Sequence, residues 1–158
     1  MGLFLLLCCK HHLSMTKILR TCILACLIIP GTYGQEQIFG KWKTVDDETG
    51  ETKSVVEIFK KDNKAFGRIV EIINKDRQDA VCDKCDTDDP RRDQKILGME
   101  IIKDLEKDGN EWDGGTILDP QNGKVYKCKL WVEDKKLTVR GYIGFSWIGR
   151  SQTWLRTE

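Results

Sequence analysis

Short segments of alternating apolar and polar residues fill the chain from about residue 38 to its end. In segment 125–132 every second residue is apolar, and two of the residues between them are lysines. Segment 137–143 alternates in the same way. A period of two residues is typical of a β-strand with one buried face. This pattern favours a sheet over a helical bundle.

Clusters rich in Asp, Asn, Gly and Lys separate these segments at 46–50, 61–64, 107–110, 119–123 and 133–136. Within 35–158, Ile, Val and Thr total 27 residues, whereas Ala and Leu total 8, which also favours strands. Hairpin-length connections predict an all-β, single antiparallel barrel, because closure removes exposed edges. We expect eight strands, at 39–44, 55–59, 66–73, 98–105, 111–118, 125–132, 137–143 and 152–156.

Residues 1–34 differ from the rest of the chain, because they include 21 apolar residues and no acidic ones. From Met15 the order is a basic stretch with Lys17 and Arg20, an apolar run, and small residues up to Gly34. That order is typical of a secretory signal peptide. We therefore predict a signal peptide at 1–34, with a true start at Met15 as an alternative, and a barrel domain at 35–158.

Two other interpretations of the leader are weaker. A membrane anchor needs about 20 apolar residues, and segment 18–29 is shorter and contains Arg20. A lipid-modified Cys26 is disfavoured by the apolar residues after it. We expect a periplasmic or secreted protein with no transmembrane segment in the mature chain.

Export changes which chemistry the chain can perform. The seven cysteines become three, Cys82, Cys85 and Cys128, and both histidines lie in the leader. A chain without histidine lacks the usual catalytic triads and histidine-based zinc sites. We expect no enzyme, no cofactor and no metal site. With 23 basic and 25 acidic residues in 35–158, we also expect no nucleic-acid partner.

Gly40-Lys41-Trp42 opens the first predicted strand, and Arg156 ends the last one. Lipocalin-type barrels begin with Gly-x-Trp, and an Arg from the last strand lies over the Trp at the closed end. The motif therefore predicts a lipocalin- or calycin-like barrel closed by Gly40, Trp42 and Arg156. Arg150 is a second candidate for the arginine.

Cys82-Asp83-Lys84-Cys85 is a C-x-x-C motif inside a long acidic connection, 74–95. It is compatible with a disulfide, a metal site or a redox-active pair. Neighbouring acids oppose thiolate formation, and four zinc ligands are not available nearby. A disulfide between Cys82 and Cys85 is the favoured interpretation. We expect it to stiffen the loop more than it stabilises the domain.

Taken together, the motifs resemble a bacterial family, the domain of unknown function 2147, over about residues 38–156. The resemblance implies a secreted or periplasmic lipocalin-like small barrel, and it brings no activity and no catalytic residues. Cys128 is the one departure from the family pattern. The motifs that support the resemblance are Gly40-Lys41-Trp42, 54–58, 67–70, the C-x-x-C, 96–99, 112–120, 123–127, 139–144 and 149–154.

Three functions remain open. The first is binding of a small apolar or amphipathic ligand by a monomeric barrel, in a cavity lined by Tyr126, Leu130 and Val139. The second is an envelope module that contacts protein or glycan through outward tryptophans, with Trp112, Trp131 and Trp147 as candidates. The third is a thiol or metal protein acting through the C-x-x-C. An open cavity favours the first function, and a filled barrel with an aromatic patch favours the second.

Overall fold

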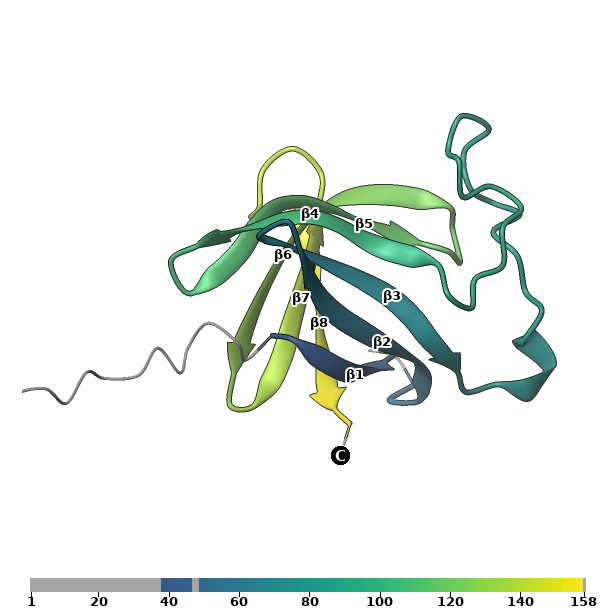
Figure 1. Cartoon of the computed structure of the whole chain (residues 1–158), viewed down its shortest axis with the longest axis horizontal. Coiled ribbons are helices and arrows are strands. Elements are labelled where there is room, and N and C mark those ends of the chain that lie inside the picture. The colour runs from purple at the N-terminus through teal and green to yellow at the C-terminus, as the bar shows by residue number, and fades with distance from the viewer. Residues whose placement is uncertain (1–37, 47–48, 158) are drawn as a thin grey trace, which may run out of the picture. The chain divides into compact units, whose positions relative to one another are not determined.

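The computed structural model describes residues 38–46 and 49–157, so the predicted leader and its cleavage site lie outside the described part. The described residues form a closed antiparallel barrel in which each strand pairs with the next (Figure 1). The prediction of an eight-stranded all-β barrel is confirmed, and within this part of the chain the helical structure is one short 3-10 turn, η1 (Lys75–Arg77). The strands are β1 (Gly40–Val45), β2 (Thr52–Lys61), β3 (Lys64–Ile72), β4 (Glu100–Asp108), β5 (Glu111–Asp119), β6 (Lys124–Glu133), β7 (Lys136–Tyr142) and β8 (Gly149–Arg156).

Several strands are longer than predicted, because their hairpins are tighter than the turn clusters suggest. Asp62 and Asn63 connect β2 to β3 with φ of 50° and 62°, and Asp134 and Lys135 connect β6 to β7 with φ of 49° and 62°. Two consecutive residues with positive φ match the twist of antiparallel strands in a two-residue hairpin. The charged residues on either side of these turns therefore belong to the strands.

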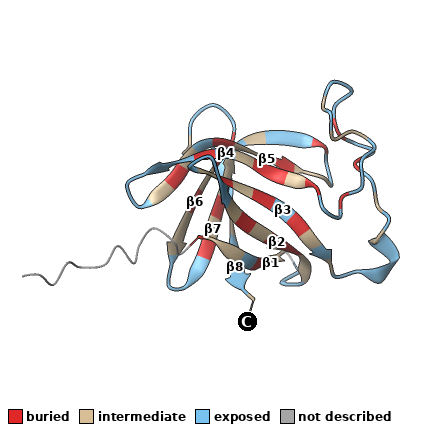
Figure 2. Cartoon of the chain, in the orientation of Figure 1, coloured by how far each residue is buried: buried red, intermediate tan, exposed pale blue. Residues whose placement is uncertain are grey.

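Apolar side chains from the strands form one core cluster. Figure 2 shows the buried positions in red along the strands. Trp42 and Trp154 are the largest fully buried side chains. They share one core cluster with Leu130, Leu137 and Ile102. No polar or charged residue among the described ones is classed as buried. The inward positions of the alternating segments thus form the hydrophobic core that their period predicts.

The long connection between β3 and β4 is the most irregular part of the barrel domain (Figure 1). It contains η1, an isolated bridge between Val81 and Lys95, and the predicted disulfide between Cys82 and Cys85, which is confirmed. Both cysteines are buried and belong to the core cluster of the barrel. The disulfide therefore contributes to the core, whereas the sequence suggested a mainly local role.

Candidate binding surface

Arg156 lies over Trp42 at the closed end of the barrel. Its Cζ is 4.2 Å from the centre of the indole ring, and its Nη1 donates to the carbonyl oxygen of Phe39 at 3.1 Å. The indole Nε1 donates to the carbonyl oxygen of Ile38 at 2.8 Å, so the buried ring has its donor paired. Gly40 has a φ of 119°, and a Cβ there would lie 3.0 Å from Nη1 of Arg156. The three predicted closure residues meet at one point.

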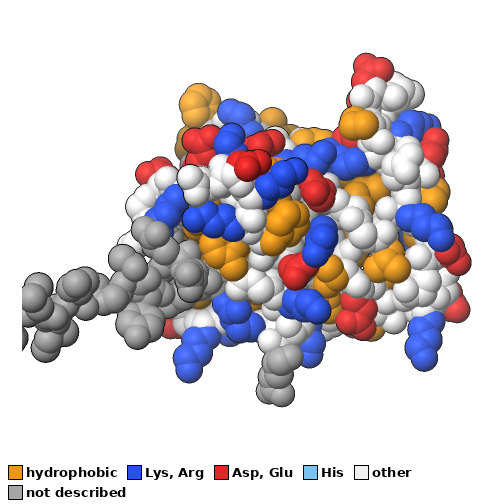
Figure 3. Space-filling model, viewed as in Figure 1, with side chains coloured by type: hydrophobic (Ala, Val, Ile, Leu, Met, Phe, Trp, Pro, Cys, Tyr) orange, Lys and Arg blue, Asp and Glu red, His pale blue; other side chains and the backbone are white. Residues whose placement is uncertain are grey.

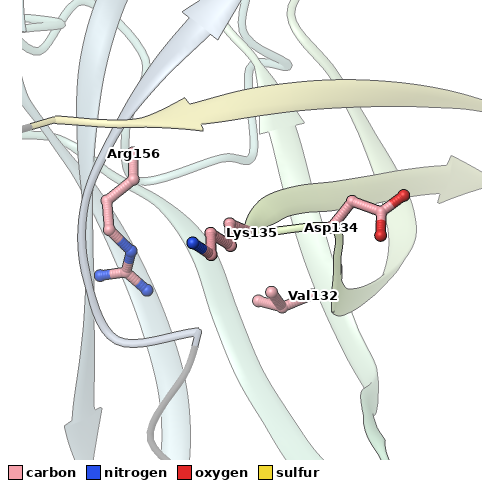
Figure 4. A pocket seen from close by; sticks show the side chains of 4 residues that line it. All are labelled: Val132, Asp134, Lys135 and Arg156. Atoms are coloured by element: carbon pink, nitrogen blue, oxygen red, sulfur yellow. The ribbon is translucent and has the colours of Figure 1, made fainter.

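A shallow hollow of about 390 Å³ lies beside this closure, lined by Val132, Asp134, Lys135 and Arg156 (Figure 4). The close-up shows Lys135 and Arg156 extending toward the same space, while the Asp134 carboxylate points away. Arg150, the alternative closure residue, lies opposite Gly141 near the other end of β8. The hollow is small, and its arginine already participates in closing the barrel.

A second hollow, of about 550 Å³, lies between the long connection and β4, and it includes Arg91 in its lining. Arg91 and Asp89 form a bidentate ion pair, in which Nη2 donates to Oδ2 at 2.6 Å and Nε donates to Oδ1 at 2.9 Å. Arg91 also donates to the carbonyl oxygen of Glu100 at 3.2 Å. The hydrogen bonds from Arg91 lower the pKa of Asp89 to about 2. The ion pair lies within the long connection, and the hydrogen bond from Arg91 to Glu100 links the connection to the first residue of β4.

Two of the three residues predicted to line a ligand cavity belong to the hydrophobic core. Leu130 and Val139 are buried in the core and face each other across β6 and β7. Tyr126 is half-buried, and its hydroxyl accepts a hydrogen bond from Asn122 at 3.2 Å. None of the three lines either hollow. The sequence left open whether the interior is empty or filled, and the packing of bulky side chains such as Trp154 in the same core cluster favours a filled one.

All three cysteines of the barrel domain are buried. Cys82 and Cys85 are buried as a disulfide, which disfavours exchange with an external thiol. Cys128 is a free buried cysteine, and burial, with a smaller effect of Asp113, raises the pKa of its thiol well above the usual range. No group of three metal-ligating side chains occurs among the residues that the structure describes.

The most unusual surface is the connection between β7 and β8, which we call the β7–β8 loop (143–148). Its Phe145 and Trp147 side chains are 67% and 74% exposed, and their rings stack with centroids 5.9 Å apart. Ile143 and Ile148 are also exposed. In Figure 3 hydrophobic side chains project from the upper edge of the molecule, where Figure 1 places this loop. Hairpin connections are usually polar, so this apolar tip is a candidate contact surface.

Hydrogen bonds link the loop to neighbouring strands and join residues within the loop. Arg140 donates from Nε to the carbonyl oxygen of Ser146 at 2.6 Å and from Nη1 to the hydroxyl of Ser151 at 2.8 Å. Lys127 Nζ donates to the carbonyl oxygen of Gly144 at 3.5 Å. Within the loop, the amide of Ile148 donates to the carbonyl of Phe145 at 2.9 Å, and the amide of Ile143 to that of Ile148 at 3.3 Å. The aromatic pair is therefore presented on an ordered support.

The base of the loop is positively charged. Lys127 and Arg140 have no carboxylate within ion-pair distance among the residues described. The nearby Asp113 accepts hydrogen bonds from the Tyr142 hydroxyl at 2.9 Å and from the amide of Gly114 at 2.6 Å. Burial and the bond to Asp113 raise the pKa of Tyr142 to about 12. Two cations thus lie beside an apolar tip.

The three tryptophans that the sequence proposed for an outer surface differ in their exposure to solvent. Trp112 is buried and packs edge-on against Phe39, with ring centroids 5.3 Å apart. Trp131 is half-buried beneath Lys129, whose Nζ is 5.4 Å from the ring centre. Trp147 is highly exposed. Phe145 was missed, although an apolar run in a hairpin connection is a signal that could have identified it.

A β-barrel of eight antiparallel strands with an arginine over its first-strand tryptophan defines a lipocalin-like protein. A family model described as an uncharacterised protein conserved in bacteria, DUF2147, matches residues 40–156. The chain belongs to this family, which confirms the resemblance.

Among solved structures, the chain is similar to one described as "Protein HP1028 from the human pathogen Helicobacter pylori belongs to the lipocalin family". The two chains are 20% identical with a TM-score of 0.65, and the match covers 75% of this chain and 82% of the other. At that identity the likeness supports the fold alone. A search of curated proteins gives no match. Among the described residues, no helix has the length and hydropathy needed to cross a membrane.

Proposed function

We propose that this chain is an exported, non-catalytic binding module that contacts its partner through the β7–β8 loop. The observation behind the proposal is the stacked, solvent-exposed pair of Phe145 and Trp147. Exposing such side chains to water is unfavourable, and burying one on binding gains about 1.5–3 kcal/mol. Because Arg140 and Lys127 already order the loop, little conformational entropy is lost on binding.

The location outside the cytoplasm is supported by two independent features. Residues 1–34 have the residue order expected of a signal peptide, and the barrel contains a disulfide between Cys82 and Cys85. Structural disulfides are typical of oxidising compartments. The absence of histidine from 35–158 and the high pKa of the buried Cys128 thiol support a binding role over a catalytic one.

Binding of a small apolar ligand inside the barrel is the second candidate. The lipocalin-like fold favours it, since barrels of this size hold one small ligand when their interior is open. The packing of Trp42, Trp154 and Leu130 opposes it, because a ligand would have to displace them. Native mass spectrometry of the protein purified from its own cells tests this candidate. A retained apolar ligand that survives replacement of Phe145 and Trp147 by Ser would favour the interior over the loop.

Photo-cross-linking tests the loop directly. A photoreactive phenylalanine analogue replaces Phe145 in the full chain, and the intact cells are irradiated. The matched control carries the same analogue at Leu155, which is 42% exposed on β8. We expect an adduct at position 145, of whatever chemical class, and none at position 155. Equal labelling at the two positions, or none at either, would contradict the proposal.

A further inference from the structure

We propose that the β7–β8 loop docks the barrel on an anionic phospholipid surface, an inference that rests on the proposed function and specifies its partner. The apolar tip contains Phe145 and Trp147, and isoleucines flank them at both ends of the loop. Aromatic side chains, Trp above all, favour the boundary between headgroups and acyl chains. A tip of this composition matches that boundary.

Part of the loop backbone is suited to an apolar medium, because several of its carbonyl groups have hydrogen-bond partners within the protein. Polar backbone groups that enter lipid must find partners within the protein. The carbonyl oxygen of Gly144 accepts from Lys127, and that of Ser146 accepts from Arg140. Those of Phe145 and Ile148 accept from amides of the same loop. Four carbonyl groups of the tip can therefore leave water without losing their hydrogen bonds.

The positive charge at the base of the loop favours a lipid surface that is negatively charged. Lys127 and Arg140 have no carboxylate partner among the residues described. A basic residue near an anionic membrane contributes about 1 kcal/mol of attraction. With the tip at the acyl boundary, these cations lie at headgroup depth. The partner is thus both apolar and anionic, which describes a bilayer of acidic phospholipid.

The test uses the full chain and vesicles of phosphatidylcholine, with or without 30% phosphatidylglycerol by mole. Trp147 is the reporter, because it is the most exposed of the five tryptophans. We expect a blue shift of its emission and quenching by brominated acyl chains on the anionic vesicles. Replacing both Phe145 and Trp147 by Ser should weaken binding roughly tenfold or more. Trp147→Phe should keep binding and lose the blue shift.

Matched variants separate the contribution of the apolar tip from that of the cations at the base of the loop. Leu97→Ser removes an exposed apolar side chain from the long connection and should leave binding unchanged. Lys127→Gln should weaken binding to the anionic vesicles about fivefold, whereas Lys41→Gln on β1 should not. Equal binding to neutral and anionic vesicles would contradict the role of the cations. Because any contribution of residues 1–34 is common to all variants, the comparison reports on the loop.

The outcomes also separate this inference from the proposed function. Absence of vesicle binding, together with a protein adduct at position 145 in the cross-linking experiment, overturns the membrane inference and leaves the loop as a protein-binding site. Absence of both overturns the two proposals together. Vesicle binding that survives the double Ser variant and shows no quenching of Trp147 would overturn the assignment of the loop.

Discussion

The guanidinium of Arg156 lies 4.2 Å from the centre of the Trp42 ring, and the two residues face each other in the pairing of β1 with β8. The contact therefore joins the first and last strands at the point where the barrel closes. An arginine in this position stacks on the indole and still donates to the Phe39 carbonyl at 3.1 Å. A cation over a tryptophan face contributes about 0.5–2 kcal/mol, depending on its exposure to water.

Substitution at this contact should destabilise the barrel. Trp42→Ala removes a fully buried aromatic side chain, and we expect a loss of about 3–5 kcal/mol in the free energy of unfolding. Arg156→Lys should lower the melting temperature by a smaller but measurable amount, because an ammonium group cannot stack as a planar guanidinium does. Circular dichroism measures both effects, the first in urea denaturation and the second in thermal unfolding. Arg77→Lys, at an exposed position in η1, serves as the control, and equal stability of Arg156→Lys and this control would contradict the role of the stack.

Gly40 should be intolerant of a side chain. Its φ of 119° lies in a region that residues with a Cβ rarely adopt, and a Cβ would meet Arg156 Nη1 at 3.0 Å. Backbone strain of this kind costs on the order of 1–3 kcal/mol. We expect Gly40→Ala to be clearly less stable than Gly50→Ala, since Gly50 also has a positive φ of 71° but a Cβ added there would meet no atom within 4 Å. Thermal unfolding of the two variants decides the point, and equal melting temperatures would exclude a steric role for Arg156.

Acid should weaken the attachment of the long connection. The pKa of Asp89 falls to about 2 in the folded chain because of Arg91, and an unpaired aspartate titrates near 3.9. A lowered carboxyl pKa stabilises the fold above the unfolded pKa, and this contribution disappears as the pH falls toward 2. The side chains of the pair are 11% and 13% exposed, so we expect a contribution of about 1–2 kcal/mol.

The variant Asp89→Asn should lack that part of the acid dependence. Unfolding in urea between pH 5 and pH 2 would show a shallower loss of stability than in the wild type. Asp79→Asn is the control, because Asp79 pairs with Lys95 at 2.8 Å on the surface with 89% of its side chain exposed. A control variant with the same shallower slope would show that the acid dependence arises elsewhere.

Arg140 should control the order of the β7–β8 loop without controlling the stability of the barrel. Its guanidinium bonds to the Ser146 carbonyl at 2.6 Å and the Ser151 hydroxyl at 2.8 Å. Hydrogen bonds from a charged group contribute about 1.5–3 kcal/mol, so Arg140→Gln should speed amide exchange at Ile148 roughly tenfold or more. Hydrogen exchange measured by NMR provides the test. Lys129→Gln, which breaks the 2.6 Å ion pair with Glu111, should leave that amide unchanged.

The sequence by itself determined the number, order and antiparallel pairing of the strands. Alternation with a period of two and local turn clusters depend on neighbouring residues, so they are visible without a structure. The closure was also predictable, because Trp42 and Arg156 belong to the first and last strands, which must pair in a closed barrel. The family resemblance over 38–156 rested on the same local motifs, and the family model matches 40–156.

Only the tertiary structure decided which surfaces are available for binding. The alternation placed Leu130 and Val139 on the inner face, but whether that face surrounds a cavity depends on the combined volume of side chains from every strand. The same holds for Cys82 and Cys85, which become part of the core because the long connection packs back on the barrel. The sequence offered Trp147 as one of three candidate outward tryptophans and did not single out Phe145, and the structure shows that both are exposed in the β7–β8 loop. Strand periodicity is a property of adjacent residues, whereas cavities and exposed patches are properties of contacts between distant ones.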